Sequence, residues 1–234
     1  MTRWDVLGFG AVAVDDLIYV ERFPPPDGKA PVRASRREAG GLAGTALSAA
    51  ARLGARAAYC GVLGSDELSR FTRDELARYG VDCSPIITDA DARPIHSTII
   101  VEQETGHRCI FFSSDGVMPV PFEVIDRALI ASARVLFVDY TVSAVGLAAS
   151  RIAREHGIPV VGDIEPGDDP ALPELVQAID HLIVGVEMAQ RLTGYADPAE
   201  AAGALLCPGR ACATVTASER GCWYAVPGAP VRHV

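Results

Sequence analysis

Residues 38–64 read EAGGLAGTALSAAARLGARAAYCGVLG, and this stretch decides the fold. It begins with a glycine cluster at Gly40, Gly41 and Gly44, and we expect Thr45 to cap the alanine-rich helix that follows. A later glycine ends that helix, and the closing AAYCGVLG predicts a buried strand. A glycine turn before a helix can bring backbone N–H groups close to a ligand, but an ordinary tight turn has the same pattern.

The chain on either side of this stretch shows two kinds of pattern. Residues 4–14 predict a strand of a buried sheet, which ends at Asp15. Downstream, two β-rich runs flank a short turn with a glycine and predict a hairpin. Helices and strands alternate after the hairpin, and the predicted strands span residues 135–139, 158–164, 181–184 and 211–217.

This alternation implies right-handed βαβ units, and therefore a three-layer α/β/α, Rossmann-like fold with a mostly parallel sheet. Four β segments do not fit that sheet, and they predict a small separate β sheet able to act as a lid. These segments span residues 17–20, 29–37, 95–102 and 107–113. The chain has no internal repeat, so residues 1–234 are expected to form one domain into which the lid is inserted.

Acidic residues follow several of the predicted strands. Ligands of open α/β sheets bind beyond the carboxyl ends of the strands. This rule places Asp15, Asp139, Asp163 and Gly185 near one edge of the predicted sheet. A single carboxylate there is also what a helix cap or a loop requires, but several on one edge indicate a binding site.

Composition argues against several classes of function. With 21 basic and 30 acidic side chains the net charge is -9, which argues against nucleic acid and anionic membranes as partners. The six cysteines form no Cys-x-x-Cys pair and the five histidines are scattered. We therefore expect reduced thiols in a cytoplasmic protein without a zinc site. No uncharged apolar run is long enough to span a membrane, and the first residues lack the signal-peptide pattern.

The sequence contains one loose nucleotide-binding motif and lacks another. Residues 8–13, GFGAVA, match the loose dinucleotide fingerprint G-x-G-x-x-A. That fingerprint needs a helix directly after the glycines, whereas the β-branched, proline-rich sequence that follows predicts none. A nicotinamide-dependent oxidoreductase is therefore a lesser alternative. The chain has no G-x-x-x-x-G-K-[ST] sequence, which argues against a P-loop NTPase.

The order of these features resembles the ribokinase-like (pfkB) family of sugar and nucleoside kinases over essentially the whole chain. LGFGAVAVDDLIYVERFP resembles the family's first strand and loop, and Asp15 matches the aspartate that holds sugar hydroxyls. GGLAGTALSAAARLGARAAYCGVLGSD resembles its first signature. The resemblance implies an ATP-dependent, Mg²⁺-requiring kinase that phosphorylates a hydroxyl of a sugar or sugar-like molecule. It also implies a homodimer formed through the lid.

The resemblance assigns roles to further residues on the sugar side. Gly40, Gly41 and Gly44 would lie against the sugar, with Thr45 as a polar contact where the family commonly has asparagine. Threonine is shorter and lacks the amide fork, although it can still donate and accept a hydrogen bond. Arg108 in the hairpin could contact an anionic substituent, but a solvated strand arginine is the simpler explanation.

On the nucleotide side, ATVTASERGCWYA is similar to the family's T-x-G-x-x-G strand and turn. The resemblance places the nucleotide near Gly185, Thr216, Ser218 and Gly221, with Ser218 in place of the usual glycine. The family's N-x-x-E segment, linked to Mg²⁺ and phosphate binding, has lost both motif residues here, which leaves Glu187 as the metal candidate. Thr45 and Gly185, each in a place where the family has asparagine, look more like the ketohexokinase and sulfofructose kinase branch than ribokinase itself.

The family's second signature, D-T-x-G-A-G-D, supplies the anion hole and the catalytic aspartate. No such run occurs before Val234. The resemblance therefore implies that the C-terminal part of the fold is truncated, that the catalytic base lies C-terminal to Val234, and that phosphorylation by this chain is impaired. The alternative is a catalytically inactive homologue that binds a ligand or a partner chain.

Overall fold

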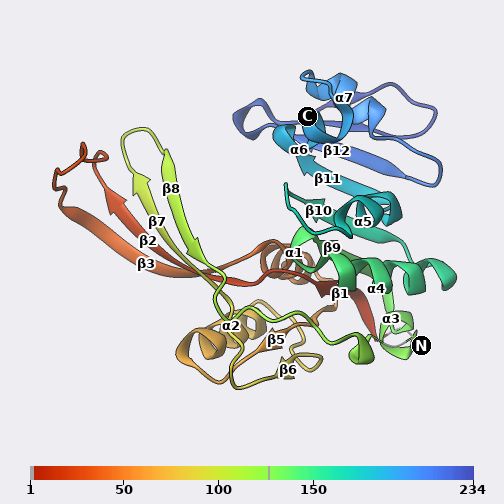
Figure 1. Cartoon of the computed structure of the whole chain (residues 1–234), viewed down its shortest axis with the longest axis horizontal. Helices are drawn as coiled ribbons and strands as arrows, with labels where there is room; N and C mark the ends of the chain where they lie inside the picture. The colour runs from red at the N-terminus through yellow and green to blue at the C-terminus, as the bar shows by residue number, and fades with distance from the viewer. Residues whose placement is uncertain (1–2, 126) are drawn as a thin grey trace.

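The computed structural model describes residues 3–125 and 127–234 (Figure 1). Its main sheet is parallel apart from two antiparallel pairings at one edge, so the predicted mostly parallel α/β fold is confirmed. In spatial order the strands are β14 (Arg232–His233), β13 (Cys222–Ala225), β12 (Cys212–Thr216), β11 (His181–Gly185), β10 (Val160–Ile164), β9 (Ala133–Asp139), β1 (Trp4–Phe9) and β4 (Ala57–Tyr59).

A second sheet extends away from the main sheet and is called the lid below (Figure 1). Its strands, in spatial order, are β3 (Val32–Gly40), β2 (Ala13–Val20), β7 (Ile95–Glu102) and β8 (Arg108–Ser113). β2 and β7 run parallel, and the other two pairings are antiparallel. The prediction of one strand over residues 4–14 is wrong, because the chain leaves the main sheet after Phe9 and turns at Gly10 into the lid.

Short strands complete the β structure. The strand predicted over residues 57–64 is divided between β4 of the main sheet and β5 (Val62–Leu63). β5 pairs with β6 (Ile87–Thr88) in a separate two-stranded sheet. The division follows from the glycine at position 61, whose backbone passes so close to the Tyr59 ring that a Cβ there would lie 2.2 Å from its hydroxyl oxygen.

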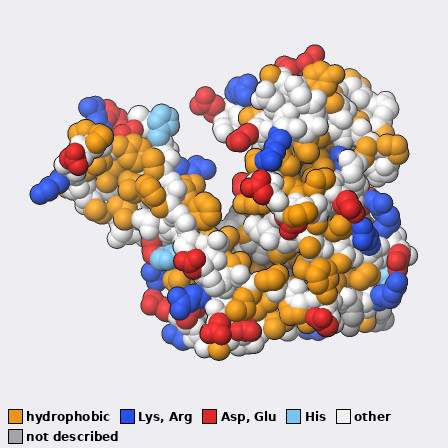
Figure 2. Space-filling model, viewed as in Figure 1, with side chains coloured by type: hydrophobic (Ala, Val, Ile, Leu, Met, Phe, Trp, Pro, Cys, Tyr) orange, Lys and Arg blue, Asp and Glu red, His pale blue; other side chains and the backbone are white. Residues whose placement is uncertain are grey.

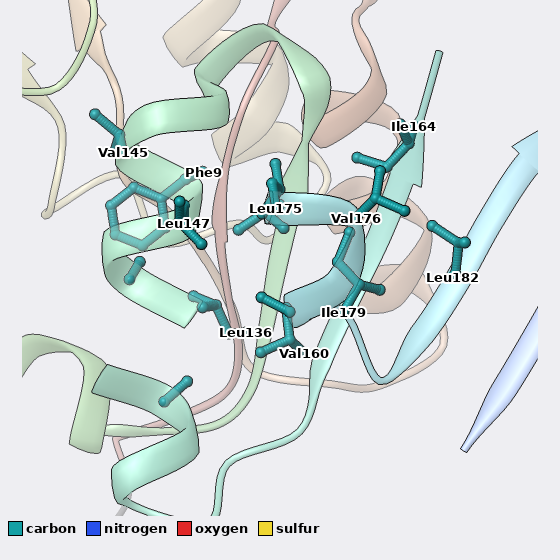
Figure 3. Close-up of a cluster of buried hydrophobic side chains, with 14 of the residues drawn as sticks. Phe9, Leu136, Val145, Leu147, Val160, Ile164, Leu175, Val176, Ile179 and Leu182 are labelled. Carbon is teal, nitrogen blue, oxygen red and sulfur yellow. The ribbon is translucent and has the colours of Figure 1, made fainter. Parts of the chain in front are cut away.

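Helices cover both faces of the main sheet. They are α1 (Leu42–Arg52), α2 (Glu67–Arg78), α3 (Arg127–Ala131), α4 (Ser143–Glu155), α5 (Leu172–Ala178), α6 (Val186–Thr193) and α7 (Pro198–Ala204). Successive residues of β9 point to opposite faces. Leu136 and Val138 therefore pack in the core of α4 and α5, where Figure 3 shows Leu136. Phe137, on the other face, packs with Leu47 of α1.

The α1 face is covered only in part. α1 packs on β1, β4 and β9. Beside it lies an apolar groove of about 670 Å³ that includes Val135, Phe137, Val161 and Ile183. None of the helices in the two described ranges combines the length and the apolar character needed to cross a membrane.

The glycine cluster forms the start of α1. Gly41 is the N-cap residue, with φ at +84°, and no side chain caps this helix. The prediction that Thr45 caps the helix is therefore wrong: Thr45 lies in the first turn, and its backbone N–H donates to the Gly41 carbonyl at 2.9 Å. A Cβ on Gly41 would lie 2.5 Å from the carbonyl oxygen of Ala11, so the turn requires glycine for space as well as for conformation.

Candidate functional site

A pocket of about 770 Å³ lies between the lid and the carboxyl ends of the main-sheet strands. Its polar and charged side chains come from the lid, from α1, from β10 and from the segments that directly follow β9 and β10. They are Asp15, Thr45, Ser97, Arg108, Tyr140, Thr141, Asp163 and Glu165. Apolar side chains of the lid, among them Ile99, Ile110 and Phe112, form much of the remaining wall.

Asp15 lies inside lid strand β2, not at the end of a main-sheet strand as the sequence predicts. Side chains alternate along β2, so Asp15 faces the pocket while its neighbour Asp16 faces the other side of the lid. Ser97 stands opposite Asp15 in the β2–β7 register, and both line the pocket. Burial raises the pKa of the Asp15 carboxyl above its usual value, although the Ser97 hydrogen bond acts in the other direction.

The glycine turn brings backbone to the pocket floor. Gly40 and Gly41 both line the pocket, and a Cβ on Gly40 would lie 2.2 Å from Oδ2 of Asp15. Thr45 lines it one turn into α1. The prediction that Gly44 also lies against the ligand is not supported, because Gly44 is buried next to Val12 and does not line the pocket. Its backbone N–H donates to the Ala11 carbonyl at 3.1 Å. Gly44 therefore serves the packing of α1 against the β1–β2 connection.

The connection between β1 and β2 is held from two sides. The Tyr59 hydroxyl donates to the Gly10 carbonyl at 3.0 Å. On the other side Asp139 accepts hydrogen bonds from the backbone N–H of Ala11 at 2.7 Å and of Thr141 at 2.9 Å. Asp139 is fully buried, and burial raises the pKa of its carboxyl. Its position at the end of β9 is the predicted one, but its contacts make it an anchor of this connection, and it does not line the pocket.

Two further carboxylates line the pocket wall formed by the main sheet. Asp163 lies next to the end of β10, and Glu165 follows directly after that strand. Burial, and then the negative charges of Glu165 and Asp139, raise the pKa of Asp163 to about 6. Asp163 is therefore mostly ionised at neutral pH, where it can accept a hydrogen bond from a bound polyol, and it becomes a donor as well when the pH falls toward 6.

Arg108 begins β8 on the pocket side of the lid and is exposed. Within residues 3–125 and 127–234 no ion pair or hydrogen bond of its guanidinium is found. The structure thus gives Arg108 both the solvated environment of a surface arginine and access to a ligand in the pocket.

The residues assigned to the nucleotide lie on the neighbouring part of the same sheet edge. Gly185 ends β11, Thr216 ends β12, and the two stand opposite each other in register. Ser218 has φ at +52° and Gly221 has φ at +77°. A left-handed backbone at 218 explains why glycine suits this turn; serine adopts it here at a cost of about 1–2 kcal/mol. Two strand spacings, roughly 10 Å, separate β10 from β12.

Glu187 lies in the first turn of α6 and is exposed. No group of three or more His, Cys, Asp or Glu side chains that could hold a metal is found in the part of the chain that the structure describes. Mg²⁺ commonly takes one or two protein carboxylates together with substrate phosphates and water, so a single glutamate fits a nucleotide-borne ion but does not by itself form a site.

The dinucleotide hypothesis fails on local structure. Residues 8–13 are followed by lid strand β2, where the fingerprint requires a helix. Gly8 packs against the Leu47 side chain, and Gly10 against the Asp139 carboxylate, so these glycines serve close packing inside the fold.

Several pocket residues were missed from the sequence. Tyr140 and Thr141 directly follow Asp139, and the carboxyl-end rule would find them if it were extended by two residues. Glu165 follows Asp163 in the same way. Ser97 has no local signal, because only the pairing of β2 with β7 places it beside Asp15.

Comparisons with known proteins identify the family of this chain and its relatives. Residues 5–234 match the pfkB family carbohydrate kinases. Ribokinase of Staphylococcus aureus is 27% identical over 194 residues, which are 81% of this chain and 63% of the relative. The ATP-dependent ribose-1-phosphate kinase of Halopiger xanaduensis is 28% identical over 184 residues, 75% of this chain and 61% of the relative. The chain thus spans less than two thirds of the length of both curated relatives.

Solved structures share the fold. A crystal structure from Agrobacterium tumefaciens, provisionally assigned as a ribokinase, has a TM-score of 0.86 at 29% identity, with 98% of this chain and 75% of that chain covered. Arabidopsis thaliana ribokinase, complexed with ribose and ATP, has a TM-score of 0.78 at 18% identity, with 100% and 78% covered. At 18% identity, the similarity to the Arabidopsis thaliana structure supports the fold only.

Proposed function

Because this chain belongs to the pfkB family of carbohydrate kinases, we propose that it serves the ATP-dependent phosphorylation of a hydroxyl on a sugar or sugar-like molecule. The observation that carries the proposal is the pocket between the lid and the main sheet, in which Asp15 and the Gly40–Gly41 backbone meet. A polyol fits this lining, since carboxylates accept hydrogen bonds from hydroxyls and small-molecule sites combine apolar walls with a few polar groups.

In this proposal each pocket residue has a defined task. Asp15 accepts hydrogen bonds from two sugar hydroxyls, and Ser97 holds its carboxylate in place. Gly40 and Gly41 allow the sugar to approach the backbone, and Thr45 adds one polar contact. Arg108 is placed to meet an anionic substituent if the sugar carries one.

We place the nucleotide along the ends of β11 and β12, near Gly185, Thr216, Ser218 and Gly221. The nearby sugar pocket makes this arrangement suitable for transfer between the two ligands, because phosphoryl transfer depends mainly on positioning and charge neutralisation. ATP supplies the phosphoryl group, and Mg²⁺ neutralises its charge. Glu187, in the first turn of α6, is the residue proposed to hold the ion through a bound water.

We also propose a homodimer through the lid, in a cytoplasmic setting. The support for the dimer is an apolar lid surface: Val32, Ile110, Phe111 and Phe112 are all at least half exposed. Figure 2 shows hydrophobic side chains gathered on the lid. Ile110 and Phe112 face the pocket, whereas Phe111 alternates to the other face of β8, and it is this other face that we propose for the dimer contact.

The test is binding and turnover with D-ribose, the sugar named for the ribokinase relatives. Isothermal titration of this chain with D-ribose, without and with Mg-ATP, should give saturable binding that Asp15→Asn weakens. An ADP-release assay then measures turnover. D-ribose binding without turnover would favour the inactive, ligand-binding alternative. Absence of binding by D-ribose and by a panel of pentoses and hexoses would refute the proposed sugar site. The narrower ketohexokinase and sulfofructose kinase branch stays a prediction that the same panel addresses.

A further inference from the structure

A network of four charged or titratable side chains lies on the back of the lid, directly behind Asp15. Asp16 accepts hydrogen bonds from Arg37, with Nε at 2.7 Å and Nη2 at 3.0 Å, and pairs with Nε2 of His96 at 2.8 Å. Arg37 also donates from Nη1 to Glu67 at 2.8 Å. We call Asp16, Arg37, His96 and Glu67 the root network.

The root network joins three lid strands to a helix of the body. Asp16 belongs to β2, Arg37 to β3 and His96 to β7, while Glu67 begins α2. α2 packs against β2 and β3, and in Figure 1 it lies beneath the point where the lid leaves the body. The network therefore connects the lid to the body at the base of the lid, where a small rotation of the lid would cause a larger displacement at its far end.

The position of the network relates it to the pocket. Asp15 and Asp16 are consecutive residues of one strand, so their side chains leave the same short backbone segment in opposite directions. Likewise His96 and Ser97 are consecutive in β7, and Ser97 stands opposite Asp15 in the β2–β7 register and lines the pocket with it. The bonds on the back of the lid thus fix the two backbone segments that aim Asp15 and Ser97 into the pocket.

The bonds of Asp16 are of the stronger kind. A bidentate arginine–carboxylate pair has defined geometry as well as charge, and here a third donor shares the carboxylate. The Asp16 and Arg37 side chains are only 30% and 35% exposed, whereas Glu67 is 77% exposed and adds little. The hydrogen bonds from Arg37, and secondarily from His96, lower the pKa of Asp16 to about 2, so it is ionised throughout the physiological range.

We propose that Asp16 and Arg37 are positioning residues for the sugar site: by locking β2, β3 and β7 together at the root of the lid, they hold Asp15 in its binding orientation. This inference rests on the proposed sugar-binding function of the pocket. Neither residue lines the pocket, so their effect is transmitted through Asp15 and Ser97.

The test compares Asp16→Asn with a matched control. Asp5 forms a similar bidentate pair with Arg56, at 3.1 Å to each of its carboxylate oxygens and with 27% exposure, on a strand of the main sheet. Asp5 also lies 3.5 Å from Nη1 of Arg134 and accepts the Arg56 backbone N–H at 3.0 Å, so a loss of stability alone would affect Asp5→Asn at least as strongly as Asp16→Asn. We expect the dissociation constant for D-ribose, by isothermal titration, to rise about tenfold in Asp16→Asn and less than about twofold in Asp5→Asn.

Two further variants separate positioning from general damage. In the double variant Asp15→Asn/Asp16→Asn, affinity should equal that of Asp15→Asn alone, because the network acts only through Asp15. Arg37→Lys keeps the charge but loses the fork and should be intermediate. Additive losses in the double variant, or equal affinities of Asp16→Asn and the Asp5→Asn control, would overturn the proposal.

A measurement without ligand keeps the two hypotheses apart. Amide hydrogen exchange over residues 13–18 and 95–99 should be faster in Asp16→Asn than in Asp5→Asn or the unmodified chain. If the unmodified chain binds no sugar, the proposed function fails, and faster exchange would still show that the network holds the lid root. Unchanged exchange in Asp16→Asn would refute the network's role regardless of sugar binding.

Discussion

Replacing Gly40 by alanine should weaken sugar binding while leaving the fold intact. A Cβ at this position would lie 2.2 Å from Oδ2 of Asp15, whereas ordinary van der Waals contact begins at 3.4 Å. The carboxylate oxygen must therefore retreat by about 1 Å. Because it belongs to the far end of a side chain, rotation can absorb the clash, and the φ angle of Gly40 is not positive, so alanine brings little backbone strain.

The displacement gives the expected magnitude. A shift of about 1 Å in a positioning group can cost as much as about 100-fold, so we expect the dissociation constant for D-ribose to rise about 10- to 100-fold. This range corresponds to about 1.4–2.7 kcal/mol of binding free energy. Isothermal titration measures the affinity, and differential scanning calorimetry measures the unfolding midpoint, which should fall by no more than a few degrees.

Two other glycines serve as controls. Gly41→Ala combines a positive φ with a backbone clash against Ala11, so it should lower the unfolding midpoint strongly. Gly54→Ala has a positive φ but no atom within 4 Å of the new Cβ, so it should cost about 1 kcal/mol of stability without changing affinity. The reasoning is refuted if Gly40→Ala binds D-ribose as tightly as the unmodified chain, or if its midpoint falls as far as that of Gly41→Ala.

Three other predictions concern charge, buried hydrogen bonds and association. The pKa of Asp163 is raised to about 6, so its contribution to stability is fully present below its unfolded pKa near 4 and is lost as pH rises through about 6. The unfolding midpoint of Asp163→Asn should therefore increase relative to that of the unmodified chain as pH rises from 4 to 7. A difference between the two midpoints that does not change with pH would contradict this. Arg210 is buried and donates to three backbone carbonyls. Arg210→Ala should therefore lower the unfolding free energy, measured by urea titration, by about 3–5 kcal/mol. The control Arg191→Ala, which changes an exposed arginine, should lower it by less than about 1 kcal/mol. Phe111→Asp should shift a dimer to monomer in analytical ultracentrifugation, whereas Phe122→Asp on the body should not; a dimer that survives Phe111→Asp would exclude this part of the lid.

The amino-acid pattern alone determined the class of fold. Alternating helical and strand periodicities predicted the order of β9–α4–β10–α5–β11, and the hairpin at β7 and β8 was predicted within one residue of its bounds. These features depend on local periodicity and turn chemistry, which a single sequence displays directly. The same local signal gave a wrong prediction for residues 4–14, which form a mostly hydrophobic run. Nothing in that run indicates the turn at Gly10, after which the chain enters the lid.

The pocket was determined by contacts between segments far apart in the chain. Parallel pairing of β2 with β7 brings Ser97 to Asp15, and the sheet order brings Asp163 of β10 to the opposite wall. Strand register is set by the packing of whole faces, so no local window contains it. The glycine-rich stretch indicated the family and one side of the pocket, but the task of each glycine followed only from the tertiary structure. Gly40 leaves room for a carboxylate, Gly41 begins a helix, and Gly44 packs below the β1–β2 connection, because different distant segments lie against each of them.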